Sequence, residues 1–311
     1  MPYNLVNFAI CCKVLLIINT RFISGHEDPK PVKILYDRKP CGMILTSHAD
    51  GPRGKQPAGN QRGISTLVGP SETKSKTGDI DEDLTNWLAG LIDGDGGFYI
   101  SKAGYISCEI TMHSKEVQTL YFIKSILGGY VHPRVKADAY RWRLHKTSDI
   151  MFLLNLINGR IRTKSKQEQL KKIFLLKNIT YIEPNKLTVD NSWLSGFFSA
   201  EGSFRLSESR LSPSISIGQK EKNILEDIKN VWGGSVNYAK TWDGWLWVCG
   251  GLAQLNILTT YFNNYSLRNP YKIAKLKGFE RYLRMYGRGD HLDPVKKLKV
   301  IRFIQLYQGK I

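Results

Sequence analysis

The chain has 311 residues, 42% of them hydrophobic, and carries 45 Lys and Arg against 27 Asp and Glu, a net charge of +18 with a pI near 9.6. This length supports a sizeable core in about one to three domains, and the charge favours a polyanionic partner, either nucleic acid or a membrane surface. Five cysteines form no CxxC pair and no Cys/His series of zinc spacing, so neither a disulfide framework nor a zinc finger is indicated.

The first 80 residues differ in character from the rest. An apolar run from Leu5 to Ile18 is interrupted by Asn7 and Lys13 and is too short to span a membrane, so we interpret it as a local core piece or a leader. Residues 51–78 are rich in Gly, Ser, Thr, Pro and Lys, which is typical of a flexible linker. Residues 1–80 are therefore predicted to be a poorly ordered N-terminal extension and linker, with +5 of the net charge against +13 for the remainder.

One stretch of the chain occurs twice. Residues 87–98 read WLAGLIDGDGGF, and residues 193–204 read WLSGFFSAEGSF. The tryptophans of the two copies, and likewise the acids Asp95 and Glu201, are separated by 106 residues, so we infer a duplicated unit. Each copy places an apolar helical segment directly before an acid flanked by small residues.

The elements of the first unit, residues 81–185, follow from periodicity. Residues 105–113 alternate, with Ile106, Cys108, Ile110 and Met112 on one face, which predicts a half-buried strand. A helix over 115–127 ends at Gly128-Gly129, two strands over 130–136 and 140–146 follow, and helices over 148–158 and 164–178 close the unit. The predicted order is helix, two strands, helix, two strands, helices.

The second unit, residues 186–290, repeats this order. Strands are predicted near 204 and over 212–218, then a helix over 221–232 ending at Gly233-Gly234, strands near 236 and over 245–249, and helices over 252–262 and 271–285. A basic helix over 294–307, in the C-terminal segment 291–311, has no counterpart. The tryptophans that recur in pairs are assigned to the core and not to base stacking: Trp87, Trp142, Trp193 and Trp247.

The two acids are candidates for one shared site. Asp95 and Glu201 would meet if their helices pack about a pseudo-twofold axis, and small residues on one helix face would allow a close approach: Ala89, Gly90, Ser195 and Gly196. Paired carboxylates with no Cys or His nearby favour a hard cation such as Mg²⁺, which promotes phosphodiester hydrolysis. For one acid alone a helix terminator in a turn would be the better interpretation, but its recurrence in both copies favours a site.

These motifs carry a resemblance to a known family. Residues 88–96, LAGLIDGDG, are similar to the LAGLIDADG motif, residues 194–202 keep its glycines and acid, and residues 83–286 resemble a two-repeat, monomeric LAGLIDADG homing endonuclease. The resemblance implies an α+β fold of two pseudo-symmetric αββαββα units, whose saddle-shaped antiparallel sheets lie in the DNA major groove. It also implies cleavage of both strands with Mg²⁺, or Mn²⁺ as a substitute. By position, Asp95 and Glu201 would be metal ligands, and the carbonyls of Gly94 and Ala200 further ligands.

The resemblance extends to supporting catalytic residues. Lys164 stands where the family has a lysine that acts on the attacking water or the phosphate. In the second unit the position equivalent to Lys164 is occupied by Pro270, which leaves Lys272 as a substitute. Gln219 matches a water-positioning glutamine, and Ser114 occupies the equivalent place in the first unit. The alternative for each lysine is a solvated surface charge.

The alternation of the later strands predicts the DNA contacts. In the first unit a basic face suits phosphate contacts and guanine recognition: His132, Arg134, Lys136, Arg141 and Arg143. In the second unit the corresponding face is less basic and offers Ser214, Ser216, Asn237 and Lys240. Leu246 and Val248 stand at the positions equivalent to Arg141 and Arg143. An ordinary solvent-facing sheet is the alternative for this second face.

The function predicted from these features is a site-specific double-strand DNA endonuclease of the intron homing type, monomeric and without a membrane partner. The alternative is an RNA maturase that assists splicing of its host group I intron, with or without residual DNA cleavage, because Ser199 replaces the first acid of the motif and the second sheet is milder. A third reading is a catalytically inactive DNA-binding relic. Family habit indicates a mitochondrial protein, with the plastid as the alternative.

Overall fold

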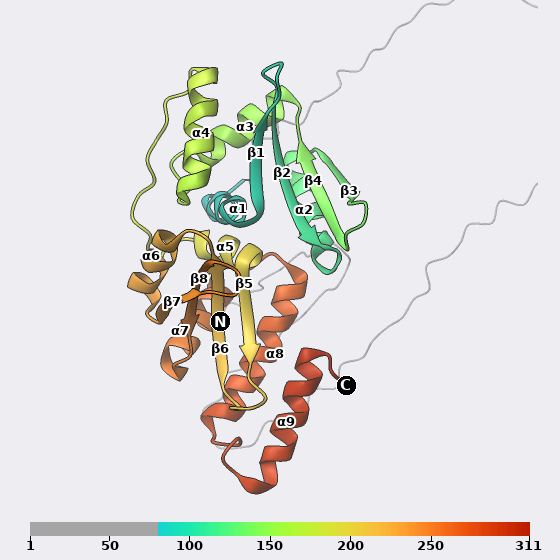
Figure 1. Cartoon of the computed structure of the whole chain (residues 1–311), viewed down its shortest axis with the longest axis vertical. Coiled ribbons are helices and arrows are strands. Elements are labelled where there is room, and N and C mark those ends of the chain that lie inside the picture. Colours follow the sequence, from blue (N-terminus) through green and yellow to red (C-terminus); the bar gives the residue numbers. More distant parts are fainter. Residues whose placement is uncertain (1–79) are drawn as a thin grey trace, which may run out of the picture. The chain divides into compact units, whose positions relative to one another are not determined.

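The computed structural model describes residues 80–311. The predicted N-terminal extension and linker lie outside the described residues, apart from Ile80. The described chain has the predicted α+β class, with the same order of elements occurring twice (Figure 1). Within these described residues, no helix combines the length and the apolar character that crossing a membrane requires.

The first repeat runs from α1 to α4. Its motif helix begins after Asp81, whose carboxylate accepts a hydrogen bond from the Leu84 amide at 2.6 Å, and it ends at the motif acid. The elements are α1 (Glu82–Asp95), β1 (Gly96–Ile100), β2 (Ile106–His113), the 3-10 turn η1 (Ser114–Glu116), α2 (Val117–Leu127), β3 (Tyr130–Pro133), β4 (Ala139–Leu144), α3 (Thr147–Ile157) and α4 (Lys164–Lys177).

The second repeat has the same order but a shorter motif helix and no counterpart of η1. It is followed by the predicted C-terminal basic helix, α9. The elements are α5 (Trp193–Glu201), β5 (Gly202–Leu206), β6 (Pro213–Gln219), α6 (Lys222–Trp232), β7 (Ser235–Ala239), β8 (Gly244–Cys249), α7 (Leu252–Asn264), α8 (Pro270–Gly287) and α9 (Pro294–Gln308).

Each repeat forms one four-stranded antiparallel sheet, with strand orders β1-β2-β4-β3 and β5-β6-β8-β7. Helices pack against one face of each sheet, and the side chains predicted to point inward from β2 are at most 6% exposed. The two motif helices α1 and α5 lie side by side between the sheets (Figure 1). The core therefore continues from one repeat into the other through this helix pair.

The Gly-Gly pairs that end α2 and α6 form equivalent corners. The indole N–H groups of Trp142 and Trp247 donate to the carbonyls of Gly128 and Gly233, each at 2.8 Å. The next residue, Gly129, has φ +83°, and an added β-carbon would lie 2.6 Å from the Arg143 carbonyl oxygen, so only glycine fits there. All four paired tryptophans are fully buried, which confirms their assignment to the core.

One predicted strand is shorter than expected. The strand predicted over 130–136 ends at Pro133, and residues 134–138 form the turn to β4. The Arg134 amide still donates to the Ala139 carbonyl at 2.9 Å, but Lys136 adopts φ +62°, a left-handed conformation that a strand does not contain. The prediction that Arg134 and Lys136 lie on a strand face is therefore wrong, and both lie on the hairpin turn.

Candidate active site

The motif helices meet at two glycines in a reciprocal arrangement. An added β-carbon at Gly90 would lie 2.0 Å from the carbonyl oxygen of Trp193, and one at Gly196 would lie 1.8 Å from the carbonyl oxygen of Trp87. Each helix thus presses a backbone carbonyl into the space left by a missing side chain on the other. The neighbouring small residues Ala89 and Ser195 are fully buried.

The acids Asp95 and Glu201 are the last residues of α1 and α5. An added β-carbon at Gly94 would lie 3.2 Å from Cγ of Glu201, so the Glu201 side chain packs beside the residue that precedes Asp95. Burial, and then the nearby Glu201 carboxylate, raise the pKa of Asp95 to about 7. Burial also raises the pKa of Glu201. The helix pair therefore concentrates two partly desolvated carboxylates at one place.

This donor set fits a hard divalent cation. Two carboxylates are available, and the described residues contain no group of three or more His, Cys, Asp and Glu that could hold a metal. A cation bound here would keep most of its positions for water and phosphate oxygens, as Mg²⁺ prefers. Of the two carbonyls expected as further ligands, that of Ala200 already accepts a hydrogen bond from Lys272 Nζ at 3.0 Å.

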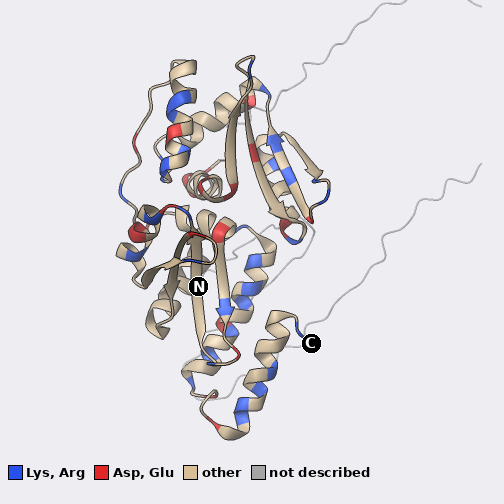
Figure 2. Cartoon of the chain, in the orientation of Figure 1, with Lys and Arg blue, Asp and Glu red and all other residues tan. Residues whose placement is uncertain are grey.

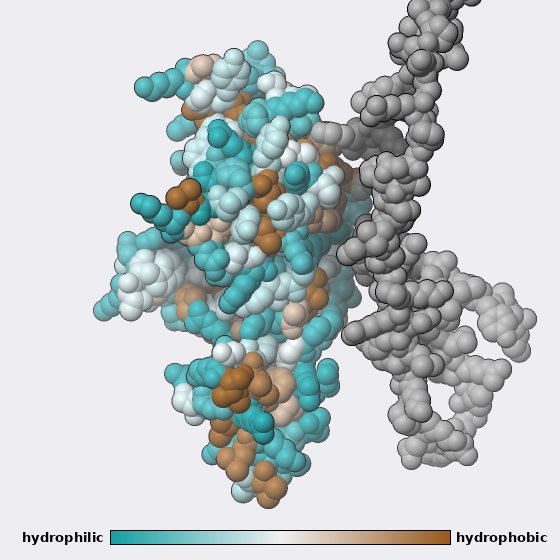
Figure 3. Space-filling view, turned by 90° about the vertical axis from the view of Figure 1, so that its right-hand side faces the viewer, coloured by the Kyte–Doolittle hydropathy of each residue, from teal (hydrophilic) through white to brown (hydrophobic). Residues whose placement is uncertain are grey.

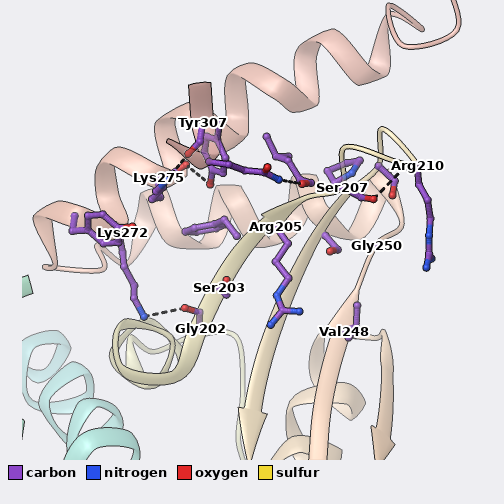
Figure 4. A pocket seen from close by; sticks show the side chains of 17 residues that line it. Gly202, Ser203, Arg205, Ser207, Arg210, Val248, Gly250, Lys272, Lys275 and Tyr307 are labelled. Atoms are coloured by element: carbon purple, nitrogen blue, oxygen red, sulfur yellow. Dashed lines mark hydrogen bonds between the residues drawn. The ribbon is translucent and has the colours of Figure 1, made fainter. Parts of the chain in front are cut away.

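Lys272 is a buried residue that holds the end of α5. Its ammonium donates to the carbonyls of Phe198, Ala200 and Gly202 at 3.0, 3.0 and 2.9 Å, the last of which is drawn in Figure 4. Burial lowers the pKa of Lys272, and its charge in turn lowers the pKa of Asp95 and Glu201. Lys272 therefore lies at the site, although its hydrogen bonds go to the backbone around Glu201.

In the first repeat the lysine that acts electrostatically on both acids is Lys166, and not Lys164. Lys164 is exposed, whereas the Lys166 ammonium lowers the pKa of both Asp95 and Glu201. Lys166 precedes Lys272 by 106 residues, the same offset that relates the two acids. Sequence reasoning missed this pair because it aligned Lys164 with Pro270; applying the repeat offset to every lysine would have found it.

Gln219 lies at the end of β6, and its side chain accepts a hydrogen bond from the next amide, that of Lys220, at 2.8 Å. The strand pairings Gly96↔Ile110 and Gly202↔Ile217 make Met112 the counterpart of Gln219 in the sheet. Ser114, expected in that place, lies in η1, an element that the second repeat lacks. The glutamine therefore has no polar equivalent in the first repeat.

Asp93, two residues before Asp95, is a buried carboxylate that the sequence reasoning passed over. It accepts hydrogen bonds from the amides of Arg162 and Thr163 at 2.8 and 2.9 Å, from the Thr163 hydroxyl at 2.6 Å and from the Trp193 indole at 2.9 Å. Burial raises its pKa to about 6, against the lowering effect of these donors. Asp93 thus ties the loop before α4 to both motif helices.

Ser199 takes the place of Asp93 in the second motif. Its hydroxyl lies 2.6 Å from the Leu267 carbonyl oxygen and 2.7 Å from that of Ser195. The Trp87 indole donates to the same Leu267 carbonyl at 2.8 Å, as the Trp193 indole does to Asp93. A backbone carbonyl of the loop before α8 therefore replaces the carboxylate as the acceptor in this repeat.

Replacing Asp93 by Asn is expected to lower the free energy of unfolding by about 1–3 kcal/mol, because an amide group would leave a buried donor unsatisfied. The matched change Ser199→Ala should cost less, since the Leu267 carbonyl keeps its bond from the Trp87 indole. Chemical denaturation of both variants measures the difference. Equal losses would contradict the distinct roles assigned to these two residues.

The open face of the first sheet carries an acid between its arginines. Glu109 on β2 pairs with Arg141 at 2.7 Å and with Arg143 at 3.3 Å, both on β4. His132 pairs with Arg141 in the strand register and lies beside it. The predicted basic residues of this face are thus together, except for Arg134 and Lys136, and Glu109 holds two of them in place.

On the second sheet the predicted polar contacts are less accessible than expected. Ser216 is only 1% exposed and Ser214 is half-buried, whereas Asn237 and Lys240 are exposed. The basic residues that sequence reasoning missed lie on β5 and the turn after it, where Arg205 and Arg210 line a pocket of about 780 Å³ (Figure 4). The alternation of Ser203, Arg205 and Ser207 was a signal for this face.

A duplicated α+β fold with two four-stranded sheets, a glycine-packed joint and acids and lysines at one repeat offset defines a two-repeat protein with a candidate site between its halves. The sequence profile described as "LAGLIDADG endonuclease" matches residues 88–174 and 194–283, one match in each repeat. The chain belongs to the LAGLIDADG endonuclease family.

Curated relatives are intron-encoded proteins that extend beyond the matched region. The intron-encoded RNA maturase bI4 of Saccharomyces cerevisiae is 38% identical over 184 residues, which covers 57% of this chain and 29% of that protein. The probable intron-encoded endonuclease aI2 of Debaryomyces hansenii is 32% identical over 235 residues, which covers 70% of this chain and 35% of that protein. The chain spans about a third of the length of these two relatives.

Solved structures share the fold. The I-LtrWI LAGLIDADG homing endonuclease bound to target DNA has a TM-score of 0.58 at 17% identity, covering 71% of this chain and 96% of that one. The I-SmaMI LAGLIDADG homing endonuclease bound to cleaved DNA has a TM-score of 0.60 at 15% identity, covering 73% and 97%. The two-repeat fold predicted from the motifs is thereby confirmed.

Proposed function

We propose that this chain is a site-specific double-strand DNA endonuclease of the intron homing type. One observation carries the proposal. The acids Asp95 and Glu201 and the lysines Lys166 and Lys272 recur at the same offset and gather at the joint between two open sheets. Relatives named as intron-encoded endonucleases support it. Because both halves of the site belong to one chain, the protein is proposed to act as a monomer.

The proposed chemistry is metal-dependent hydrolysis of a phosphodiester. Asp95 and Glu201 would hold Mg²⁺, or Mn²⁺ in its place. Such a cation, when bound, supplies an activated water and stabilises the leaving oxygen. The protein fixes the two carboxylates at the helix ends, keeps the end of α5 in place through Lys272, and presents the Lys166 ammonium to the phosphate. A positive charge there favours the negative charge that develops during the reaction.

The open sheet faces are the proposed DNA contacts. Arg141 and Arg143 suit guanine recognition from the first sheet, and His132 lies beside them. On the second sheet Arg205 and Arg210 add phosphate contacts to the polar residues Ser214, Asn237 and Lys240. Contacts on both sheets would make the target long and its recognition dependent on salt.

The test is to incubate the purified protein with the intronless allele of its host gene, with and without Mg²⁺. Both strands should be cut near the intron insertion site, and only when the cation is present. Specific, salt-dependent binding without any cutting would instead favour the inactive DNA-binding relic. Relatives named for introns, one of them a cox1 intron-2 protein of Schizosaccharomyces pombe, support a proposed mitochondrial location, with the plastid as the alternative.

A second candidate, RNA maturase activity, is favoured by charge that lies outside the sheets. Residues 270–311, which contain α8 and α9, carry 11 Lys and Arg against three Asp and Glu, a net charge of +8. Arg281, Arg284, Lys299 and Arg302 line a groove of about 900 Å³ between these helices, and Figure 2 shows basic residues along both. Figure 3 shows apolar surface gathered at the same end, where Leu298 on α9 is 74% exposed.

A double charge reversal, Arg284→Glu with Arg302→Glu, tests the RNA candidate. It should weaken binding to the host intron RNA and lower the salt slope of that binding by about two, roughly one for each cation removed. DNA cleavage should be unchanged, because neither residue lies on a sheet. A parallel splicing assay on the intron RNA decides the function: no effect of the wild-type protein on splicing would exclude the maturase.

Replacing Glu109 by Gln is expected to release Arg141 and Arg143 from their ion pairs. Non-specific DNA affinity should rise and its salt dependence steepen by about one counterion, because one negative charge leaves the face that meets the phosphates. Discrimination between target and random duplex should fall, since the arginines lose their orienting partner. Fluorescence anisotropy titrations at several salt concentrations measure both effects. An unchanged salt slope would contradict this role of Glu109.

A further inference from the structure

Two glutamates outside the motifs occupy equivalent places in the repeats. Glu116 is the N-cap residue of α2 and Glu221 is the N-cap residue of α6, 105 residues further on. A short polar side chain at this position, such as that of Asp or Ser, commonly accepts hydrogen bonds from the first turn of its own helix. Neither side chain does so here. Both reach across to the other repeat instead.

Glu221 caps the helix that carries Lys166. Its carboxylate accepts a hydrogen bond from the amide of Lys164 at 2.7 Å through one oxygen and from the amide of Ser165 at 2.9 Å through the other. The N-cap residue of α4, Thr163, makes no cap bond, because its hydroxyl donates to Asp93. The N-terminus of α4, in the first repeat, is therefore capped by a carboxylate from the second repeat.

Glu116 makes the reverse connection to the helix that carries Lys272. Its carboxylate accepts a hydrogen bond at 3.0 Å from the side-chain amide of Asn269, the buried N-cap residue of α8. The side-chain oxygen of Asn269 accepts a hydrogen bond from the backbone amide of Lys272 at 3.2 Å. The same carboxylate lies 4.0 Å from Lys272 Nζ, and both side chains are largely buried. The two connections thus differ in their hydrogen bonds but join equivalent elements: the start of α6 to the start of α4, and the start of α2 to the start of α8.

We propose that Glu116 and Glu221 are positioning residues that fix the lysine of the opposite repeat for catalysis. Each glutamate holds the first turn of a helix, and Lys166 and Lys272 each lie in that first turn, at the third helical residue of α4 and of α8. Losing Glu221 removes the cap of α4 and frees its first turn to fray. Losing Glu116 removes the hydrogen-bond partner of the Asn269 cap and the nearby charge partner of Lys272, so in each case the lysine moves. The inference deepens the proposed endonuclease function and rests on it.

The contacts of Glu116 and Glu221 with the opposite repeat predict a strand-specific effect, which a general loss of stability would not produce. The pseudo-twofold axis relates Lys166 and Lys272, and the two antiparallel strands of a duplex are related in the same way, so each lysine serves one strand. Glu221→Ala should slow cleavage of one strand and Glu116→Ala that of the other, each by about 10–100-fold, the usual loss when a supporting residue is removed. A variant that is only less stable would slow both strands alike.

The experiment measures the cutting of each strand separately on a duplex labelled at both ends, for Glu221→Ala, Glu116→Ala and Glu221→Gln. The glutamine keeps one acceptor oxygen and should recover part of the lost rate; it also carries the test if the alanine variant does not fold. Glu226→Ala is the matched control, because Glu226 lies on α6 and its ion-pair partners among residues 80–311 are Lys222 and Lys229 of the same helix. It should cut both strands as the wild type does.

A double-variant comparison separates positioning from other roles. In a Lys166→Met background, adding Glu221→Ala should slow the affected strand little further, because Glu221 acts through Lys166. Opposite strand biases together with this non-additivity would support the inference. Equal slowing of both strands, or full additivity, would overturn it while the endonuclease function stands. A wild-type protein that cuts neither strand would overturn the function and the inference together.

Discussion

Replacing Asp95 by Asn is expected to lower the rate of DNA cleavage more than about 100-fold, since a ligand should cost more than the roughly 10–100-fold lost with residues that merely support a metal site. DNA affinity should stay close to that of the wild type, because Asp95 ends α1 at the joint and is not on an open sheet face. The side chains are nearly isosteric, and one of two crowded carboxylates is removed, so the fold should not be weakened. Single-turnover cleavage and equilibrium binding measure the two properties separately.

The control for this change is Glu226→Gln, which removes the same charge from α6, where Glu226 pairs with Lys222 and Lys229. It should leave cleavage and binding unchanged. Undiminished cutting by the Asp95→Asn protein in Mg²⁺ would overturn the proposed chemistry. A parallel loss of binding would instead mean that Asp95 supports the DNA-binding surface and not the hydrolysis.

The duplication made most of the fold predictable. A constant offset, alternation on β2 and the Gly-Gly helix ends are local signals, and the structure follows them closely. Errors arose where tertiary geometry decided the outcome. The strand predicted through Lys136 ended early because Lys136 adopts a left-handed conformation in the turn, and an additional 3-10 turn in the first repeat displaced Ser114 from the position aligned with Gln219.

The two acids of the candidate site could be predicted from the sequence, but the residues that surround and position them could not. Asp95 and Glu201 lie in the repeated motif, so the repeat itself located them. Lys166 could be found only by applying the repeat offset to residues outside the motif. The partners of Asp93 and Glu221 could not be predicted, because their hydrogen bonds join positions far apart in the chain, such as Trp193 with Asp93 and Lys164 with Glu221. Such contacts leave no periodic pattern in a single sequence.

The second large effect is expected from Gly196→Ala at the helix joint. The new β-carbon would lie 1.8 Å from the Trp87 carbonyl oxygen and 2.9 Å from the Leu91 amide nitrogen, and both are backbone atoms that cannot rotate away. The helices must separate, so the cost should reach or exceed about 3 kcal/mol, the upper end of ordinary overpacking. At roughly 2–4 °C per kcal/mol for a chain of this size, the melting temperature should fall by about 6–12 °C.

The same displacement should reach the acids, because Glu201 lies five residues after Gly196 on the same helix. Cleavage by the folded Gly196→Ala protein at low temperature should therefore fall further than its loss of folded molecules explains. The matched control is Gly287→Ala at the end of α8, where the added β-carbon would meet no atom closer than 3.7 Å. Thermal melts and cleavage rates of the two proteins decide the question, and equal behaviour would contradict the claim that backbone contact at Gly196 sets the spacing of the two carboxylates.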